Sequence, residues 1–487
     1  MHIPRLSTLR VLVTVHALLC LQETAIAQKP APTVRLESAP FEAQKQTIDA
    51  DQGWLSVPEN RGNPAIRSIE LAFVRFKSTA AVPGPPLIFL VGGPGGSGIA
   101  TARSARFHLL SAMREVGDVI VLDQRGTGIS KPNLESKRRI SLPLDKPGDP
   151  GLWIDPIRAG SAECATYWKD QGVDLAGYNT AESADDVDAL RAALGYEKIN
   201  LWGTSYGTHL SFSVLRRHGQ HINRVIVSGV EGPDHTLKSP AHIQRQLGTV
   251  AKLIQDDPQW GKAFPDFIQT VRDTLERLDR EPMTVTVGSG DPIAVGKFDL
   301  QLVTSEAIGR VRTLRGLPRM YQDLAQGDAS RLAALARGFR TMELGNAMSW
   351  AMDCASGISD ERRARYEREA AQTLLGAAIN FPYMDVCPAW GVPSLGPEFR
   401  EELRSDAPVL FISGTLDGRT PPENVEELRG GFPNSEHLLV ENAGHEEELF
   451  SLAPGLHECF LGFLKGGPLP TERIVLPAVE FTPPESK

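Results

Sequence analysis

The chain has 487 residues, of which 41% are hydrophobic and 23% are charged, an ordinary composition for a soluble globular protein. Single hydrophobic cores rarely grow beyond roughly 250 to 300 residues, so we expect an insertion or a second domain. The formal net charge of −9 argues against nucleic acid as a partner, because an acidic surface repels the phosphate backbone.

The first 27 residues are typical of an export signal. Arg5 and Arg10 precede an apolar run, Val11 to Leu21, and Ala25-Ile26-Ala27 forms a small-x-small cleavage pattern. We predict cleavage after Ala27 and a secreted or periplasmic protein. An anchor helix is the alternative, but the apolar run is shorter than the roughly 20 residues that span a bilayer, and no other stretch approaches that length.

The apolar pattern then changes along the chain from alternating to continuous. Two alternating stretches, Trp54 to Val57 and Ile69 to Phe76, indicate an antiparallel strand pair. Continuous runs, typical of strands buried on both faces, follow at Leu87–Val91, Val119–Leu122, Ile199–Trp202, Val225–Val227, Val409–Ile412 and Leu438–Val440. Helical stretches separate most of these runs, which predicts an α/β architecture with a mostly parallel central sheet.

One long interval, residues 234–407, interrupts this alternation and is mainly helical in character. We predict that it is a cap inserted into one core, whose two parts are residues 28–233 and 408–487. The segment after Gly466 is rich in proline, and we expect it to follow the surface without regular structure.

The strongest chemical signal is Gly203-Thr204-Ser205-Tyr206-Gly207, which follows an apolar strand and precedes a helix. This is the context of a nucleophile elbow, in which small flanking residues relieve clashes around a strained serine. The sequence therefore predicts the α/β-hydrolase fold with Ser205 as the nucleophile.

A serine hydroxyl needs a base, and the base needs an acid that fixes its tautomer. In this fold the chain order is serine, acid, histidine. Asp417 and His445 each follow a predicted buried strand, at the sheet edge where α/β proteins place their active sites. We predict that they complete a catalytic triad, and that His209, His218 and His221 are packing or surface residues.

The transition state also needs backbone donors for its oxyanion. We predict that the N–H of Tyr206 is one, and that the glycine-rich loop Gly92–Gly98 supplies the other from Gly93, with Gly92 as the alternative. The same loop, with Asp123 further on, also matches a dinucleotide-binding pattern, so a nicotinamide oxidoreductase stays an outside alternative. Pro94 inside the turn disfavours it. No metal motif is present, and we expect no cofactor.

An exported chain cut after Ala27 has four cysteines, an even number in a compartment where disulfides persist. Cys354 and Cys387 lie 33 residues apart in the sequence of the predicted cap, and we expect them to pair. The alternatives are two buried thiols, or pairing with Cys164 or Cys459.

These motifs resemble those of the proline iminopeptidases and, more closely, of the exported tripeptidyl aminopeptidase-like serine peptidases. The resemblance rests on residues 92–96, on residues 123–128, on residues 203–208 and on the segments around Asp417 and His445. It implies hydrolysis of peptides from a free N-terminus. Iminopeptidases usually carry histidine where this chain has Val91, which argues against strict proline specificity.

An exopeptidase must bind an ammonium group, and a buried ammonium needs a carboxylate partner. Glu231 is our candidate, because it follows a buried strand where the core meets the cap. Capping a loop or pairing with an arginine of the cap is the alternative role for Glu231, and Asp353 and Asp385 are alternative candidates. A carboxylesterase using the same triad and a non-catalytic binding protein remain alternative functions.

Overall fold

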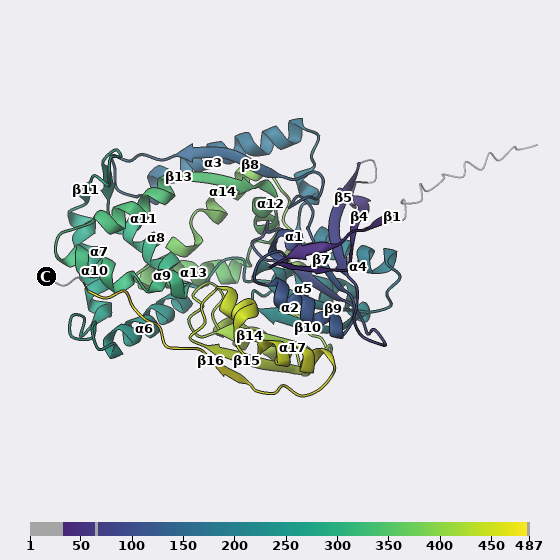
Figure 1. Cartoon of the computed structure of the whole chain (residues 1–487). Helices are drawn as coiled ribbons and strands as arrows, with labels where there is room; N and C mark the ends of the chain where they lie inside the picture. Colours follow the sequence, from purple (N-terminus) through teal and green to yellow (C-terminus); the bar gives the residue numbers. More distant parts are fainter. Residues whose placement is uncertain (1–32, 64–66, 485–487) are drawn as a thin grey trace, which may run out of the picture. The chain divides into compact units, whose positions relative to one another are not determined.

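The computed structural model describes residues 33–63 and 67–484, so the predicted signal segment, residues 1–27, lies outside the described residues. The largest sheet of the described part has ten strands, most of which are labelled in Figure 1. Its strands, in spatial order, are β1 (Thr33–Ser38), β4 (Ala50–Pro58), β5 (Ser68–Phe76), β7 (Val119–Leu122), β6 (Leu87–Leu90), β9 (Ile199–Thr204), β10 (Ile222–Ser228), β14 (Val409–Gly414), β15 (Ser435–Glu441) and β16 (Arg473–Val475).

The sheet is parallel from β7 to β16 and antiparallel from β1 to β7. The predicted antiparallel opening and the six continuous apolar strands are therefore confirmed. The sequence interpretation missed both edge strands. β16 corrects the expectation for the segment after Gly466, because three of its residues pair with β15.

Helices cover both faces of the sheet, as expected when alternate strand residues are buried on opposite sides. On one face, α4 (Thr180–Ala193) and α5 (Tyr206–His218) pack on residues such as Ile88 and Leu90. On the other face, α2 (Phe107–Ala112) and α17 (Leu456–Leu464) pack on Leu87 and Phe89. The remaining helices outside residues 234–407 are α1 (Gly98–Thr101), α3 (Pro150–Asp170) and α16 (Glu423–Leu428).

Residues 234–407 lie between β10 and β14, which are neighbours in the sheet, and they are mainly helical. Their helices are α6 (Pro240–Asp256), α7 (Phe267–Arg280), α8 (Lys297–Ala307), α9 (Val311–Leu314), α10 (Leu317–Ala325), α11 (Ser330–Arg340), α12 (Ala347–Ser356), α13 (Asp360–Gln372), α14 (Tyr383–Trp390) and α15 (Pro397–Arg400). Several of them, from α6 to α11, share a hydrophobic core that is separate from the two cores beside the sheet.

Short strands complete this arrangement: β2 (Phe41–Ala43) with β3 (Gln46–Ile48), β11 (Met283–Val285) with β12 (Ile293–Val295), and β8 (Glu135–Ser141) with β13 (Thr341–Asn346). The β8–β13 pair links residues before the predicted insertion to the insertion itself. The described residues form one compact unit, and the division into core and cap stays a prediction. Within the ranges 33–63 and 67–484, no helix combines the length and the apolar character needed to cross a membrane.

Candidate active site

The turn between β9 and α5 holds Ser205 in a strained backbone conformation. Its φ of 53° and ψ of −127° lie in a region that residues with side chains rarely adopt. Close packing explains the glycines around it, since a Cβ on Gly203 would overlap the carbonyl of Gly207, and one on Gly207 would overlap the carbonyl of Leu90. This strand, turn and helix have the geometry of a nucleophile elbow.

The fold brings the three predicted triad residues into contact. Ser205 Oγ lies 3.1 Å from His445 Nε2, and His445 Nδ1 lies 2.9 Å from Asp417 Oδ2. Asp417 follows β14 and His445 follows β15, so the carboxyl ends of neighbouring parallel strands place both beside the elbow. Both distances suit proton transfer from the serine to the histidine.

Asp417 is fully buried, and its carboxylate is held by several donors. Its Oδ1 accepts from the backbone N–H groups of Arg419 and Thr420, both at 2.8 Å. Its Oδ2 accepts from the Thr420 hydroxyl at 2.7 Å. Burial by itself raises the pKa of Asp417, but the charge of His445 and the hydrogen bonds from His445 and Thr420 outweigh it and hold the pKa below its ordinary value.

The loop that carries His445 is fixed on three sides. The backbone N–H of His445 donates to the carbonyl of Gly309, just beyond α8, at 2.9 Å. The imidazole ring of His445 packs edge-on against Phe450. Arg106 is buried and donates from Nε to Glu447 at 3.1 Å and from Nη1 to the Thr204 hydroxyl at 3.3 Å. Arg106 therefore joins the residue before the serine to the loop after the histidine, a connection that the sequence pattern did not reveal.

The two predicted oxyanion donors lie beside this turn. Tyr206 is the first residue of α5, where helix N–H groups lack an acceptor within the helix. A Cβ on Gly92 would come within 2.7 Å of the Ser205 Cβ and 3.3 Å of the Tyr206 nitrogen, so the glycine-rich loop packs directly on the nucleophile. Gly93 follows with a φ of 129°, which favours glycine, and in the described part of the chain neither its N–H nor that of Tyr206 has an acceptor.

The Asp123 carboxylate holds the glycine-rich loop in place through hydrogen bonds. One of its oxygens accepts from the Ser97 hydroxyl at 2.7 Å and from the N–H of Ile99 at 3.0 Å, and the other accepts from the N–H of Ile129 at 2.9 Å. The next residue, Gln124, donates to the Val91 carbonyl. Because these bonds occupy the Asp123 carboxylate, it is not available to hold a ribose, which weighs against the dinucleotide alternative.

Glu231 and Asp353 form a buried acidic pair near the first turn of α5. Glu231 is connected to that turn through the Thr208 hydroxyl, which donates to the Ser205 carbonyl at 2.6 Å and accepts from the Glu231 N–H at 2.7 Å. The Glu231 carboxylate forms an ion pair with Lys238 at 2.7 Å. The structural role that we considered for Glu231 is thus present, with a lysine as the partner and not an arginine.

Asp353 is 8% exposed, and within the described ranges its carboxylate has neither a hydrogen bond nor an ion pair. The pKa of Asp353 is raised well above its ordinary value, mainly by burial and next by the charge of Glu231. The charge of Lys238 acts in the opposite direction. Asp385, the third candidate, is exposed, and its backbone carbonyl accepts from Arg158. The structure therefore groups Asp353 with Glu231 and leaves Asp385 at the surface.

Cys354 and Cys387 form a disulfide, so the predicted pairing is confirmed. It joins α12, on which Asp353 precedes Cys354, to α14. Cys164 and Cys459 are buried and free.

The other histidines of the α5 region have structural partners. His209 is buried between the carbonyl of Gly232 and the Ser356 hydroxyl. His218 and His221 lie close to Asp188, near enough for one atom of each residue to ligate a cation. Their polar atoms already bond Asp188 and its neighbour Asp185, as expected of surface residues.

Comparisons with known proteins agree with this architecture. Residues 85–284 match the family model of the alpha/beta hydrolase fold, and residues 371–475 match that of the TAP-like proteins. The chain is 30% identical over 440 residues to the serine protease Hip1 of Mycobacterium bovis, covering 80% of this chain and 81% of that protein. It is 26% identical over 429 residues to a tripeptidyl aminopeptidase of Streptomyces coelicolor, covering 80% and 76% respectively.

A strand, strained serine turn and helix, with the aspartate after β14 and the histidine after β15 of a mostly parallel sheet, define an α/β-hydrolase. This chain belongs to the α/β-hydrolase family, in the branch that contains Hip1 and the tripeptidyl aminopeptidases, and it is a hydrolase.

Proposed function

We propose that this hydrolase is a serine exopeptidase that releases N-terminal residues or short peptides from peptides with a free amino terminus. The observation that carries the proposal is the buried acidic pair Glu231 and Asp353, which has one lysine partner and lies beside the turn that holds Ser205. The peptidase relatives, Hip1 and the tripeptidyl aminopeptidases, support the same class of substrate.

In the proposed reaction, the Ser205 hydroxyl attacks the scissile carbonyl while His445 Nε2 takes its proton. Asp417 accepts a hydrogen bond from His445 Nδ1–H and stabilises the imidazolium that forms. His445 then gives the proton to the leaving amine, which leaves an acyl-enzyme on Ser205. Water, deprotonated by His445, hydrolyses this ester and restores the serine. No step requires a cofactor.

The N–H groups of Tyr206 and Gly93 are the proposed oxyanion donors. Both belong to backbone that is held in place before the reaction, Tyr206 by α5 and Gly93 by the loop that Asp123 fixes. Preorganised donors of this kind stabilise the charge that develops on the carbonyl oxygen, and each is worth about 3 to 4 kcal/mol in related sites.

A charge argument identifies the proposed amine site. Glu231 and Asp353 together hold two negative charges when both are ionised, and Lys238 supplies one positive charge. An incoming ammonium group supplies the second, so a substrate with a free N-terminus offsets the charge that otherwise raises the pKa of Asp353. We therefore assign the direct contact with the ammonium to Asp353, with Glu231 supporting it, and no longer to Glu231 alone.

We also propose that the protein is exported and that residues 234–407 form the cap over the site. The N-terminal sequence pattern and the Cys354–Cys387 disulfide support export, because disulfides persist in oxidising compartments. The position of this helical segment between the neighbouring strands β10 and β14 supports the cap.

Matched substrates test the function directly. A tripeptide arylamide with a free amino terminus, its N-acetylated counterpart and p-nitrophenyl acetate should be compared by kcat/KM. We expect the free peptide to be cleaved at least tenfold better than the acetylated one, because acetylation removes the charge that Asp353 binds. Cleavage of the simple ester with no turnover of either peptide would identify a carboxylesterase instead.

A further inference from the structure

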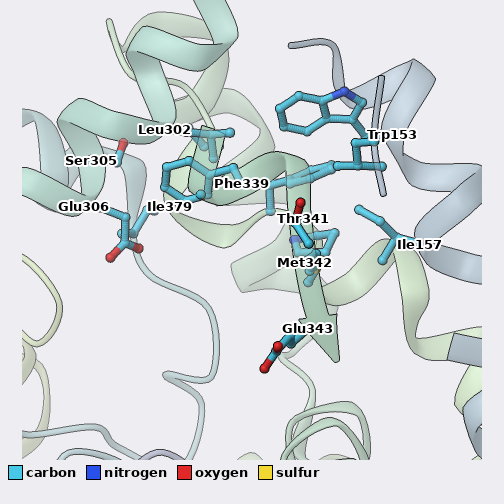
Figure 2. A pocket seen from close by; sticks show the side chains of 15 residues that line it. Trp153, Ile157, Leu302, Ser305, Glu306, Phe339, Thr341, Met342, Glu343 and Ile379 are labelled. Carbon is cyan, nitrogen blue, oxygen red and sulfur yellow. The ribbon is translucent and has the colours of Figure 1, made fainter. Parts of the chain in front are cut away.

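A cavity of about 250 Å³ lies among elements that are distant in the sequence (Figure 2). Helices α3, α8 and α11, strand β13 and the segment before α14 form its walls. Its apolar lining includes Trp153, Ile157, Leu302, Phe339, Met342 and Phe381. In Figure 2 the side chains of Glu306 and Glu343 lie apart from the indole of Trp153, and each carboxylate forms an ion pair with an arginine, Glu306 with Arg419 and Glu343 with Arg139.

Helix α8 connects this cavity to the catalytic residues. Glu306, in the cavity wall, lies 2.8 Å from Arg419, whose backbone N–H donates to Asp417. Three residues after Glu306, the carbonyl of Gly309 accepts from the backbone N–H of His445. Two of these three residues lie beyond the end of α8, and a chain segment of this length spans at most about 11 Å.

The wall of the cavity is also connected to the segments that surround Asp353. Met342 belongs to β13, and the helix that follows this strand carries Asp353. Phe381 stands two residues before Tyr383, whose phenol is close enough to the acidic pair for both charges to act on it. Burial is the largest cause that raises the pKa of Tyr383, the charge of Asp353 is the next, and the charge of Glu231 adds to the effect. The cavity wall is therefore joined to the segments around Asp353, the residue that the proposed function assigns to the substrate's amino terminus.

One polar group in the wall lacks a partner. The Ser305 hydroxyl is buried, and among the described residues it has no hydrogen-bond partner. Buried hydroxyls in proteins are almost always hydrogen-bonded, so this one requires a partner from a ligand or water. A mostly apolar cavity with one or two polar groups is the usual composition of a binding pocket.

We propose that this cavity is a specificity subsite that takes one large apolar side chain from the amino-terminal part of the peptide, the part that becomes attached to Ser205. Ser305 donates a hydrogen bond to the substrate backbone, and burial among the apolar lining disfavours acidic side chains. The volume is below the roughly 300 Å³ at which pockets for whole small molecules begin, and therefore suits a single side chain. This inference rests on the proposed exopeptidase function.

A substrate series locates the subsite. Tripeptide arylamides with alanine at all three positions, and with phenylalanine or glutamate replacing one alanine at a time, should be compared by kcat/KM. We expect phenylalanine at one position to raise kcat/KM at least tenfold over alanine, and glutamate at that position to lower it.

Two variants connect this preference to the cavity. Gly338 lines the cavity, and a Cβ there would meet no atom within 4 Å, so Gly338→Leu should narrow the cavity without a backbone clash. Phe339→Ala should widen it. Gly248→Leu is the matched control, because Gly248 is also a helical glycine with open space around it and does not line the cavity.

We expect Gly338→Leu to reduce the phenylalanine preference at least fivefold, while the all-alanine peptide and p-nitrophenyl acetate change by less than twofold. Phe339→Ala should shift the preference towards tryptophan. The inference is overturned if the wild-type enzyme cleaves these peptides without any apolar preference, or if the preference survives in both variants. A wild-type enzyme that cleaves the ester but none of the peptides would instead overturn the exopeptidase function, and with it the subsite.

Discussion

Lys238 Nζ lies 2.7 Å from Glu231 Oε2, and this ion pair satisfies one of the two buried carboxylates beside the first turn of α5. The second, Asp353, has no such partner in the described part of the chain. A cationic substrate group that enters this site therefore meets one carboxyl group that has a lysine partner and one that, among the described residues, has none. This difference distinguishes the expected effects of replacing each residue.

Asp353→Asn should lower kcat/KM on free N-terminal peptides by tenfold or more, because losing one desolvated charge partner is worth about 1.5 to 3 kcal/mol. Glu231→Gln should have a comparable effect, since it leaves Lys238 without its partner and next to the incoming ammonium. Both variants should spare p-nitrophenyl acetate, which has no ammonium. Equal losses on peptide and ester would mean that the pair supports the structure of the site and does not bind the amine.

The unusual pKa of Asp353 predicts a pH-dependent gain in stability for Asp353→Asn. A carboxyl group whose pKa is raised on folding is neutral in both states below its unfolded pKa of about 3.9. It destabilises the folded state increasingly as the pH rises from the unfolded pKa to the folded pKa, and the penalty is constant above that. Thermal unfolding should therefore show a melting temperature a few degrees above wild type at pH 8, with the difference shrinking towards pH 4. A constant or reversed difference would show that Asp353 ionises normally in the folded protein.

Ser205→Ala should abolish turnover and leave the fold intact. Removing one member of such a triad costs on the order of a million-fold in rate, about 8 kcal/mol, because the three residues act as a unit. A fluorophosphonate probe should label the wild type and not the variant, and circular dichroism should be unchanged. Normal turnover by a natively folded Ser205→Ala protein would refute the assignment of the nucleophile.

The connection through Arg106 predicts an effect from a residue that touches no substrate. Glu447→Gln removes the charge that Arg106 bonds and should loosen the loop that carries His445. We expect kcat to fall about tenfold on peptides and esters alike, with KM little changed. The neighbouring Glu448 is exposed, and Glu448→Gln should behave as wild type. A loss confined to KM, or the same loss in both variants, would contradict the positioning role.

The disulfide should contribute to the stability of the part of the chain that carries Asp353. Cys354 and Cys387 are separated by 33 residues, and the chain-entropy model gives about 3 to 4 kcal/mol for a loop of that length. The double variant Cys354→Ser with Cys387→Ser should lose about this much free energy of unfolding in urea, measured against a Cys164→Ser control. An unchanged midpoint would show that the surrounding packing alone holds α12 and α14 together.

Much of the site follows from local sequence. The elbow around Ser205 depends on glycines flanking a serine between a strand and a helix, and this is a short-range property of the backbone. Asp417 and His445 are likewise predictable, because each follows a continuous apolar strand and parallel strands end at one edge of the sheet. The pattern of apolar runs also predicts the parallel sheet itself.

Only the tertiary structure decided which side chains from distant segments meet. The sequence interpretation preferred Glu231 as the amine site and missed its partner Lys238, which stands only seven residues further along the chain. It also missed Arg106, and it missed Thr420, which stands three residues after Asp417 and bonds it. It also missed the edge strands β1 and β16, which have no continuous apolar pattern because their side chains are largely exposed.

The raised pKa of Asp353 and the apolar lining of the cavity beside α8 both result from burial among α3, β13, α12 and α14. Burial depends on how these elements pack, and no spacing of residues along the chain encodes it.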